Sequence, residues 1–201
     1  MLKFCALLLV SFGVLANPQQ ELVERINKTE GFSANFSQQV LSPDNEVLME
    51  GEGKVEISKP SLFRWTLMAP DEEVMVSDGK ALWYYSPFIE QVSIYDAQTA
   101  IEQTPFVLLT RNKNSDWDKY SITQQDNRFV LTPTAIDSNQ GQFYIDITSN
   151  GVVEGFSVVE QDGQRSHFEF SQFASAVPNK DRFVFTTPDG VEVDDQRSNV
   201  E

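Results

Sequence analysis

Carboxylates are the side chains of this sequence that could carry out chemistry, because other reactive groups are scarce. The acidic clusters are Asp71-Glu72-Glu73, Asp116 with Asp118, and Asp194-Asp195. Two acids that face each other across a cleft could hydrolyse a glycosidic bond by acid and base catalysis. Nothing in the sequence places two of them across such a cleft, and most charged clusters are solvated turns. We therefore expect no enzyme activity from these acids.

The other motifs for catalysis, metal binding and nucleotide binding are incomplete. His167 is the single histidine, so neither a Ser-His-Asp triad nor a multi-histidine metal site is easily assembled. We expect it to be an ordinary strand residue, with pH sensing as the alternative. The stretch "GEGKVE" at Gly51 lacks both the spacing and the Ser or Thr of a phosphate-binding loop. No calcium loop of the form Asp-x-Asp-x-Asp-Gly occurs either.

The N-terminus predicts that the protein is exported. Residues 1–16, "MLKFCALLLVSFGVLA", carry one lysine before an apolar run and end in small residues. This pattern is typical of a secretory signal peptide cleaved after Ala16. A membrane-spanning helix needs about 20 apolar residues, so we expect no stable membrane insertion. Cys5 is the only cysteine, and an exported protein without disulfides fits a bacterial envelope.

The net charge restricts the partners. The formal charge is −15 at pH 7, which would repel nucleic acids and anionic lipid surfaces. We expect no nucleic acid partner, and a partner that is neutral, apolar or locally basic. A simpler interpretation is that the acidity only keeps the protein soluble.

Aromatic and apolar side chains are concentrated between Lys59 and Val92. Phe63, Trp65 and Leu67 share one face of a predicted strand, because successive strand side chains point to opposite faces. They could form an ordinary core, but a two-layer core needs a second apolar layer of matching size. The predicted helices are too short to supply that layer. Part of this sheet face is therefore expected to line a cavity for an apolar ligand, with core packing as the alternative.

About eleven strands are predicted, and short turns join them. The turn signals are Pro43-Asp44-Asn45, Asp78-Gly79, Ser149-Asn150-Gly151, Gln161-Asp162-Gly163 and Pro188-Asp189-Gly190, all interpreted as strand-to-strand connections. Two segments have helical spacing instead, one after Asn17-Pro18 and one between Ala97 and Leu109. The pattern predicts a large antiparallel sheet that curls or closes. No linker or repeat divides residues 17–201, which we expect to form one domain.

Four blocks of the sequence, in this order, resemble one known family. They are "GEGKVEISKPSLFRW", "PDEEVMVSDGKALWYYSPFIEQV", "TPFVLLTRNKNSDW" and "GVEVDDQRS". The chain resembles the periplasmic outer-membrane lipoprotein carrier proteins, the LolA family. The resemblance implies a half-open antiparallel β-barrel of about eleven strands, with short helices forming a lid over an apolar cavity. It also implies a periplasmic, monomeric chaperone that takes triacylated lipoproteins from an inner-membrane ABC transporter and hands them to an outer-membrane receptor.

The resemblance also assigns roles to residues. Lys59 occupies the place of a basic residue that, in the family, bonds to the lid helices and holds the empty cavity shut. The residues expected to contact acyl chains are Phe63, Trp65, Leu67, Trp83, Phe106 and Leu109, the last two on the lid. This function needs no catalytic residue, metal or other cofactor. The alternative is a non-catalytic periplasmic protein that binds a free lipid or another amphiphile.

Overall fold

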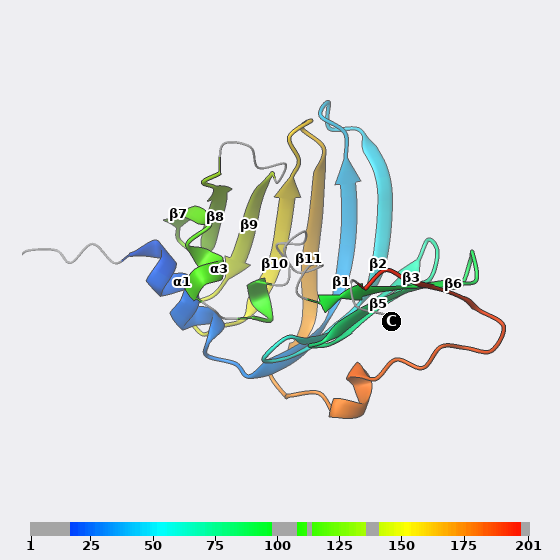
Figure 1. The fold of residues 1–201 in the computed structure, drawn as a ribbon. Helices are drawn as coiled ribbons and strands as arrows, with labels where there is room; N and C mark the ends of the chain where they lie inside the picture. The colour runs from blue at the N-terminus through cyan, green and yellow to red at the C-terminus, as the bar shows by residue number, and fades with distance from the viewer. Residues whose placement is uncertain (1–16, 98–107, 112–113, 136–140, 198–201) are drawn as a thin grey trace, which may run out of the picture.

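A curved twelve-stranded sheet dominates the structure (Figure 1). The computed structural model describes residues 17–97, 108–111, 114–135 and 141–197. The strands are β1 (Gly31–Leu41), β2 (Val47–Ser58), β3 (Leu62–Ala69), β4 (Glu73–Asp78), β5 (Ala81–Ser86), β6 (Gln91–Asp96), β7 (Tyr120–Gln125), β8 (Arg128–Pro133), β9 (Gln142–Ile147), β10 (Val153–Val159), β11 (Arg165–Ala174) and β12 (Glu192–Asp195). Their order across the sheet is β12-β6-β5-β4-β3-β2-β1-β11-β10-β9-β8-β7.

The sheet confirms the predicted mainly β, incomplete barrel. In the described residues its edge strands, β12 and β7, do not pair with each other, so the sheet stays open. Neighbouring strands are antiparallel except β12 and β6, which are parallel. Three of the four residues of β12 are acidic. Alternation of apolar and polar residues therefore does not indicate this strand.

The predicted turns after β4 and β10 are confirmed. Gly79 and Gly163 have φ angles of 87° and 91°, which glycine adopts without the penalty that a Cβ atom imposes. Asp78 stabilises the first turn, because its Oδ1 accepts hydrogen bonds from the backbone N–H groups of Lys80 and Ala81 at 2.8 and 2.9 Å. The strand-to-strand connection expected at 188–190 is wrong. The element before that turn is the 3₁₀ helix Lys180–Phe183, and the turn leads into β12, which pairs with β6.

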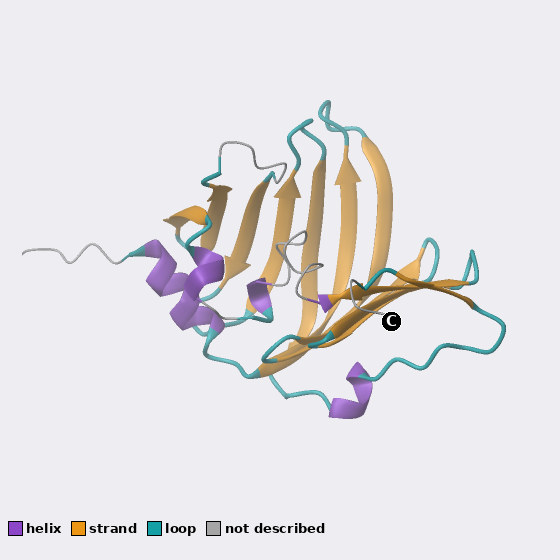
Figure 2. Ribbon diagram, viewed as in Figure 1, coloured by secondary structure: helices purple, strands orange, loops and turns teal. Residues whose placement is uncertain are grey.

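Short helical elements accompany the sheet (Figure 2). Those whose full length lies within the described residues are α1 (Pro18–Ile26), α3 (Asn114–Trp117) and the 3₁₀ helix η2 (Lys180–Phe183). The start of α1 is capped by Asn17, whose side-chain oxygen accepts a hydrogen bond from the Gln19 N–H at 3.0 Å. Leu22 and Ile26 of α1 are buried against the sheet. The predicted first helix is thus confirmed, whereas most of the second, between 97 and 109, lies outside the described residues.

Both faces of the sheet bury apolar side chains. The main core lies on the concave face, where β1, β2, β3, β8, β9 and β10 pack together with α1. A smaller core lies on the outer face of β5 and β6, where Phe185 and Val191 cover Ala81, Val92 and Ile94. The C-terminal segment after η2 runs along this outer side before it joins the sheet as β12 (Figure 1). Because the C-terminal segment packs on the outer face of β5 and β6, it does not occupy the concave face of these strands.

Candidate binding pocket

An apolar pocket opens on the concave face, at the sheet end where β3 turns into β4 and β10 turns into β11. Its volume is about 510 Å³, within the range of roughly 300–1,000 Å³ that is common for ligand sites. The apolar lining residues are Met49, Trp65, Leu67, Pro70, Met75, Phe156, Val158 and Phe168. The polar lining residues are Gln38, Asp71, Glu73, Glu160 and Ser166. Strands from both halves of the curved sheet therefore contribute to one cavity.

The alternation predicted for β3 is present. Phe63, Trp65 and Leu67 are buried at 4, 7 and 8% exposure, and the residues between them are more exposed. Trp65 and Leu67 line the pocket. Phe63 lies further along the strand, inside the main core and away from the pocket lining. Trp65 and Leu67 thus belong to the main core and also line the pocket, whereas Phe63 belongs to the core alone. Contact of these residues with acyl chains stays a prediction.

Stacked aromatic rings form the floor of the pocket. The Trp65 ring lies 4.0 Å from the Phe36 ring, centroid to centroid, and 5.4 Å from the Phe168 ring. Phe156 stacks on Phe168 at 4.4 Å. Such pairs contribute about 0.5–1.5 kcal/mol beyond the area they bury. The floor is thus a rigid aromatic surface that joins β1, β3, β10 and β11.

Gly53 allows this stack to form. It lies on β2, between Phe36 on β1 and Leu67 on β3 in the register of the sheet. A Cβ atom at Gly53 would lie 2.4 Å from Cζ of Phe36 and 2.1 Å from the carbonyl oxygen of Thr66. The absence of a side chain lets the Phe36 ring cross β2 and reach Trp65. Sequence reasoning missed this role of the "GEGKVE" stretch.

Trp83 does not belong to the pocket, which corrects the prediction. It pairs with Val76 in the sheet, whereas Tyr84 pairs with the pocket residue Met75. Trp83 therefore lies on the outer face, where its ring stacks on that of Phe185 at 6.3 Å. The hairpin of β4 and β5 is apolar on both faces, because the C-terminal segment covers the outer one. Sequence alternation alone could not decide between the two faces.

The predicted lid residues are only partly described. Leu109 is 2% exposed and packs in the main core. The next residue, Thr110, holds this segment on the turn between β2 and β3, because its carbonyl oxygen accepts a hydrogen bond from the Ser61 N–H at 3.2 Å. Phe106 lies outside the described residues.

Lys59 contacts the end of α1. Its ammonium group donates hydrogen bonds to the carbonyl oxygens of Ile26 and, at 2.6 Å, Thr29. The backbone N–H of Lys59 donates to the Glu30 carbonyl at 2.9 Å. Burial lowers the pKa of Lys59 to about 8, although the charge of Glu30 opposes this shift. The turn that carries Lys59 therefore binds the free carbonyl groups at the C-terminus of α1.

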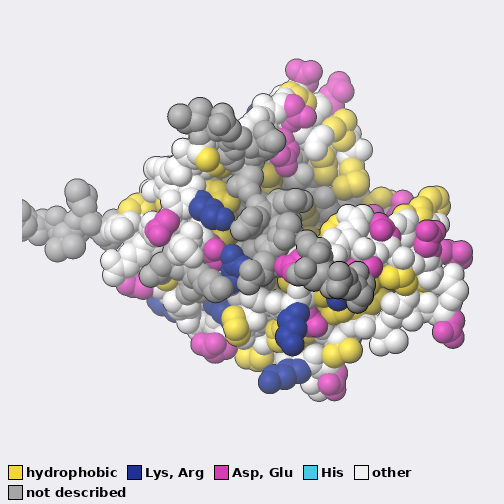
Figure 3. Space-filling view, viewed as in Figure 1, with side chains coloured by type: hydrophobic (Ala, Val, Ile, Leu, Met, Phe, Trp, Pro, Cys, Tyr) yellow, Lys and Arg dark blue, Asp and Glu magenta, His cyan; other side chains and the backbone are white. Residues whose placement is uncertain are grey.

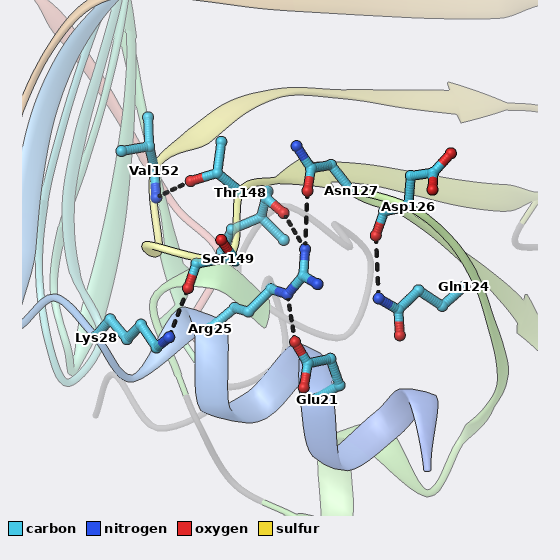
Figure 4. A network of polar contacts seen from close by, with 10 residues as sticks. Glu21, Arg25, Lys28, Gln124, Asp126, Asn127, Thr148, Ser149 and Val152 are labelled. Carbon is cyan, nitrogen blue, oxygen red and sulfur yellow. Dashed lines mark hydrogen bonds and ion pairs between the residues drawn. The ribbon is translucent and has the colours of Figure 1, made fainter. Parts of the chain in front are cut away.

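A second set of polar contacts fastens α1 to the opposite half of the sheet (Figure 4). The Arg25 guanidinium donates to the Ile147 carbonyl at 2.8 Å and to the side chain of Asn127 at 3.1 Å. It also forms an ion pair with Glu21 at 2.7 Å. Lys28 donates to the Ser149 carbonyl at 2.5 Å. Sequence reasoning missed these contacts, because the partners are about a hundred residues away in the chain.

The mouth of the pocket is acidic. Asp71 comes from the turn after β3, Glu73 from β4 and Glu160 from the turn after β10. Burial raises the pKa of the Tyr84 hydroxyl group, and the nearby Glu73 carboxylate raises it further. The described residues contain no group of three or more His, Cys, Asp or Glu side chains that could hold a metal ion. The site is therefore an apolar pocket with three carboxylates in its lining.

An open β-sheet with an apolar pocket on its concave face defines a binding protein for apolar ligands. The chain belongs to the outer membrane lipoprotein carrier protein LolA family, whose sequence profile matches residues 27–186. The membership confirms the resemblance inferred from the four sequence blocks.

Close relatives span the chain. It is 59% identical over 198 residues to the outer-membrane lipoprotein carrier protein of Vibrio vulnificus (strain YJ016), covering 98% of this chain and 100% of the relative. It is 62% identical over 199 residues to the protein of the same name from Vibrio parahaemolyticus serotype O3:K6 (strain RIMD 2210633), covering 97% and 96%.

A crystal structure of an uncharacterized conserved protein from Thermus thermophilus has the same fold. The TM-score is 0.57 at 13% sequence identity, and the match covers 88% of this chain and 98% of the other. At this identity the similarity concerns the fold alone. The described part of the chain has no helix with the length and hydropathy needed to cross a membrane.

Proposed function

We propose that this protein carries acylated lipoproteins across the periplasm by burying their acyl chains in the pocket on the concave face. The observation that supports this proposal most directly is the aromatic floor formed by Trp65, Phe156 and Phe168 beneath an open mouth. Family membership supports it as well, because the relatives are named outer-membrane lipoprotein carrier proteins. The role is transport and not catalysis.

The physical requirement for such a carrier is strong. Each CH₂ group of an acyl chain gains about 0.8 kcal/mol when it leaves water, so a triacylated protein does not cross an aqueous space unshielded. The pocket supplies apolar surface, and the core next to it supplies more if α1 moves. We expect Phe63 and Leu109 to join the acyl-chain surface in that open state, because both belong to the core cluster that also contains α1 and pocket-lining residues.

Lys59 is the proposed latch of the closed state. It fastens the C-terminal end of α1 from one side, and Arg25 fastens the helix from the other. Opening the concave face near α1 requires the Lys59 contacts to break. A cargo chain that enters beneath α1 compensates for this loss by burying apolar surface.

The proposed path begins at an inner-membrane ABC transporter and ends at an outer-membrane receptor. No nucleotide-binding motif occurs in the sequence, so the carrier itself runs downhill between the two. Residues 17–201 form one carrier domain after cleavage of the signal peptide behind Ala16, and the protein acts as a monomer.

The test is to purify the protein from the periplasm and analyse bound molecules by mass spectrometry. Acylated polypeptides support the proposal. Free fatty acids or phospholipids without attached protein would support the alternative, a store for free lipids. Release of lipoproteins from inner-membrane vesicles, with and without added carrier, measures the transport step directly.

A further inference from the structure

Three carboxylates line the mouth of a pocket whose floor is apolar. Asp71, Glu73 and Glu160 come from three different elements, yet all of them line the same cavity. Among the lining residues that the structure describes there is no Lys or Arg. When the apolar part of a ligand fills the pocket, the rest of the ligand must therefore pass the acidic mouth.

Glu73 has a polar neighbour on the next strand. Tyr84 lies on β5, and the Glu73 carboxylate, after burial, raises the pKa of the Tyr84 hydroxyl group. Glu73 itself lines the cavity.

Basic residues near the mouth do not neutralise these acids. Within the described residues, no ion pair involves Asp71, Glu73 or Glu160. Arg165 begins β11 beside the pocket residue Ser166, so it lies on the other face, where it donates to the Asn45 side chain at 2.6 Å. In the space-filling view, acidic side chains lie at the top and the right of this face and also at its left and lower edges, and Lys and Arg side chains lie between its left side and its lower edge (Figure 3).

We propose that the acidic mouth selects cargo whose polypeptide is basic immediately after its lipid anchor. This inference rests on the proposed function, since it assumes that the pocket holds the acyl chains. The anchor fills the apolar floor, and the first residues of the polypeptide then cross the mouth within reach of the three carboxylates. Lysine and arginine side chains complement these charges, whereas aspartate and glutamate are repelled by them.

The attraction should depend on salt. Charges near a protein surface attract one another more strongly than in bulk water, but salt screens them over a Debye length of about 10 Å at 0.1 M. The acyl contribution to binding does not share this dependence. Salt therefore separates the selection at the mouth from the binding of the anchor.

The experiment compares two synthetic triacylated cysteinyl peptides with short hexanoyl chains. One continues with Ser-Lys-Lys-Lys-Lys, and the other with Ser-Glu-Glu-Glu-Glu. Their affinities are measured by isothermal titration calorimetry at low and high salt. We expect the lysine peptide to bind about tenfold more tightly at low salt, as several weak surface pairs add up, and this advantage to shrink at high salt.

Variants of the mouth carboxylates test whether these residues cause the preference for the lysine peptide. In Asp71→Asn/Glu160→Gln the advantage of the lysine peptide should fall to about threefold or less. The matched control is Glu52→Gln/Glu169→Gln, which changes the net charge equally at two exposed acids that flank Ser37 on the outer face. The control should keep the full advantage. Glu73→Gln, which removes the third charge of the lining, should weaken the lysine peptide severalfold and leave a peptide with a neutral serine tail unchanged.

The outcomes separate this inference from the function on which it rests. Equal affinities for both peptides, or an equal loss of preference in the control variant, would overturn selection at the mouth while leaving the carrier function intact. Failure of every triacylated peptide to bind, the neutral one included, would overturn the carrier function and this inference together.

Discussion

Placing a carboxylate on β3 separates a cavity wall from a packed core. Leu67 and Ile57 both lie on the concave side, but Leu67 lines the pocket whereas Ile57 is fully buried in the main core. Leu67→Glu removes an apolar side chain whose burial contributes about 1.5–3 kcal/mol. Its new carboxylate can reach water through the open mouth. We therefore expect a loss in the free energy of unfolding of about 2–4 kcal/mol and a folded protein.

Ile57→Glu should behave differently. The same apolar contribution is lost, and an unpaired carboxylate without access to water costs several kcal/mol more. Together these losses approach the total stability of a domain, about 5–15 kcal/mol, so this variant should not fold. Met68→Glu is the matched control for charge, because Met68 follows Leu67 and is 55% exposed. It should change stability by about 0.5 kcal/mol or less.

Thermal melting by circular dichroism and binding of a triacylated peptide test both parts. A shift of 1 kcal/mol corresponds to about 2–4 °C in a domain of this size, so Leu67→Glu should melt roughly 5–15 °C below the wild type. It should bind the peptide poorly, because the new charge lies in the acyl site beside Asp71 and Glu73. The defect should ease at acidic pH, where the new carboxyl group is protonated. Normal binding by the folded variant would refute the assignment of Leu67 to the pocket, and unfolding would place it in the core.

Three further predictions concern the contacts that shape the closed state. Lys59 has a pKa of about 8 in the folded state and 10.5 in the unfolded state. Between these pH values the unfolded state binds more protons than the folded state. The free energy of unfolding should therefore rise from pH 8 to pH 10.5. Urea titrations should show that Lys59→Met lacks this rise, and parallel curves for both proteins would contradict it. Gly53→Ala should cost about 1–3 kcal/mol and separate Phe36 from the pocket floor, and an unchanged urea midpoint would exclude this strain. Arg25→Met should lower the free energy of unfolding by about 2–3 kcal/mol, because the Ile147 carbonyl loses its charged donor. Melting experiments measure this loss. A loss no larger than that caused by replacing an exposed arginine would show that the contact is dispensable.

Local signals in the sequence predicted most of the sheet. The alternation of Phe63, Trp65 and Leu67 and the turn at Gly79 depend on neighbours within a few residues, so they could be inferred without knowing the rest of the chain. The start of α1 is local in the same sense, since Asn17 caps it directly. The resemblance to the carrier family supplied the open barrel that these local patterns alone left undecided between curling and closing.

Features that depend on distant segments could not be inferred in this way. Trp83 was expected in the cavity because its hairpin is apolar, but Phe185, about a hundred residues later in the chain, decides which face it occupies. The partners of Arg25 are separated from it by a similar distance. β12 joins the sheet by a parallel pairing that leaves no signature of alternation in its acidic residues. In each case the long-range pairing, and not the local sequence, determines the environment of the side chain.

The "GEGKVE" stretch shows how the same residues can be interpreted correctly and still incompletely. Its spacing excludes a phosphate-binding loop, but the two glycines have a function in packing. Gly51 and Gly53 occupy successive inward positions of β2, where Val55 and Ile57 continue the same row as buried core residues. The inner face of β2 is thus filled at Val55 and Ile57 and bare at Gly53 and Gly51, and the side chain of Met49 beyond them lines the pocket. Phe36 crosses the bare stretch at Gly53 to meet Trp65, and Gln38 and Leu67, which lie beside Gly51, line the pocket. The boundary between core and pocket therefore follows from the gap that two glycines leave in the inner row of β2.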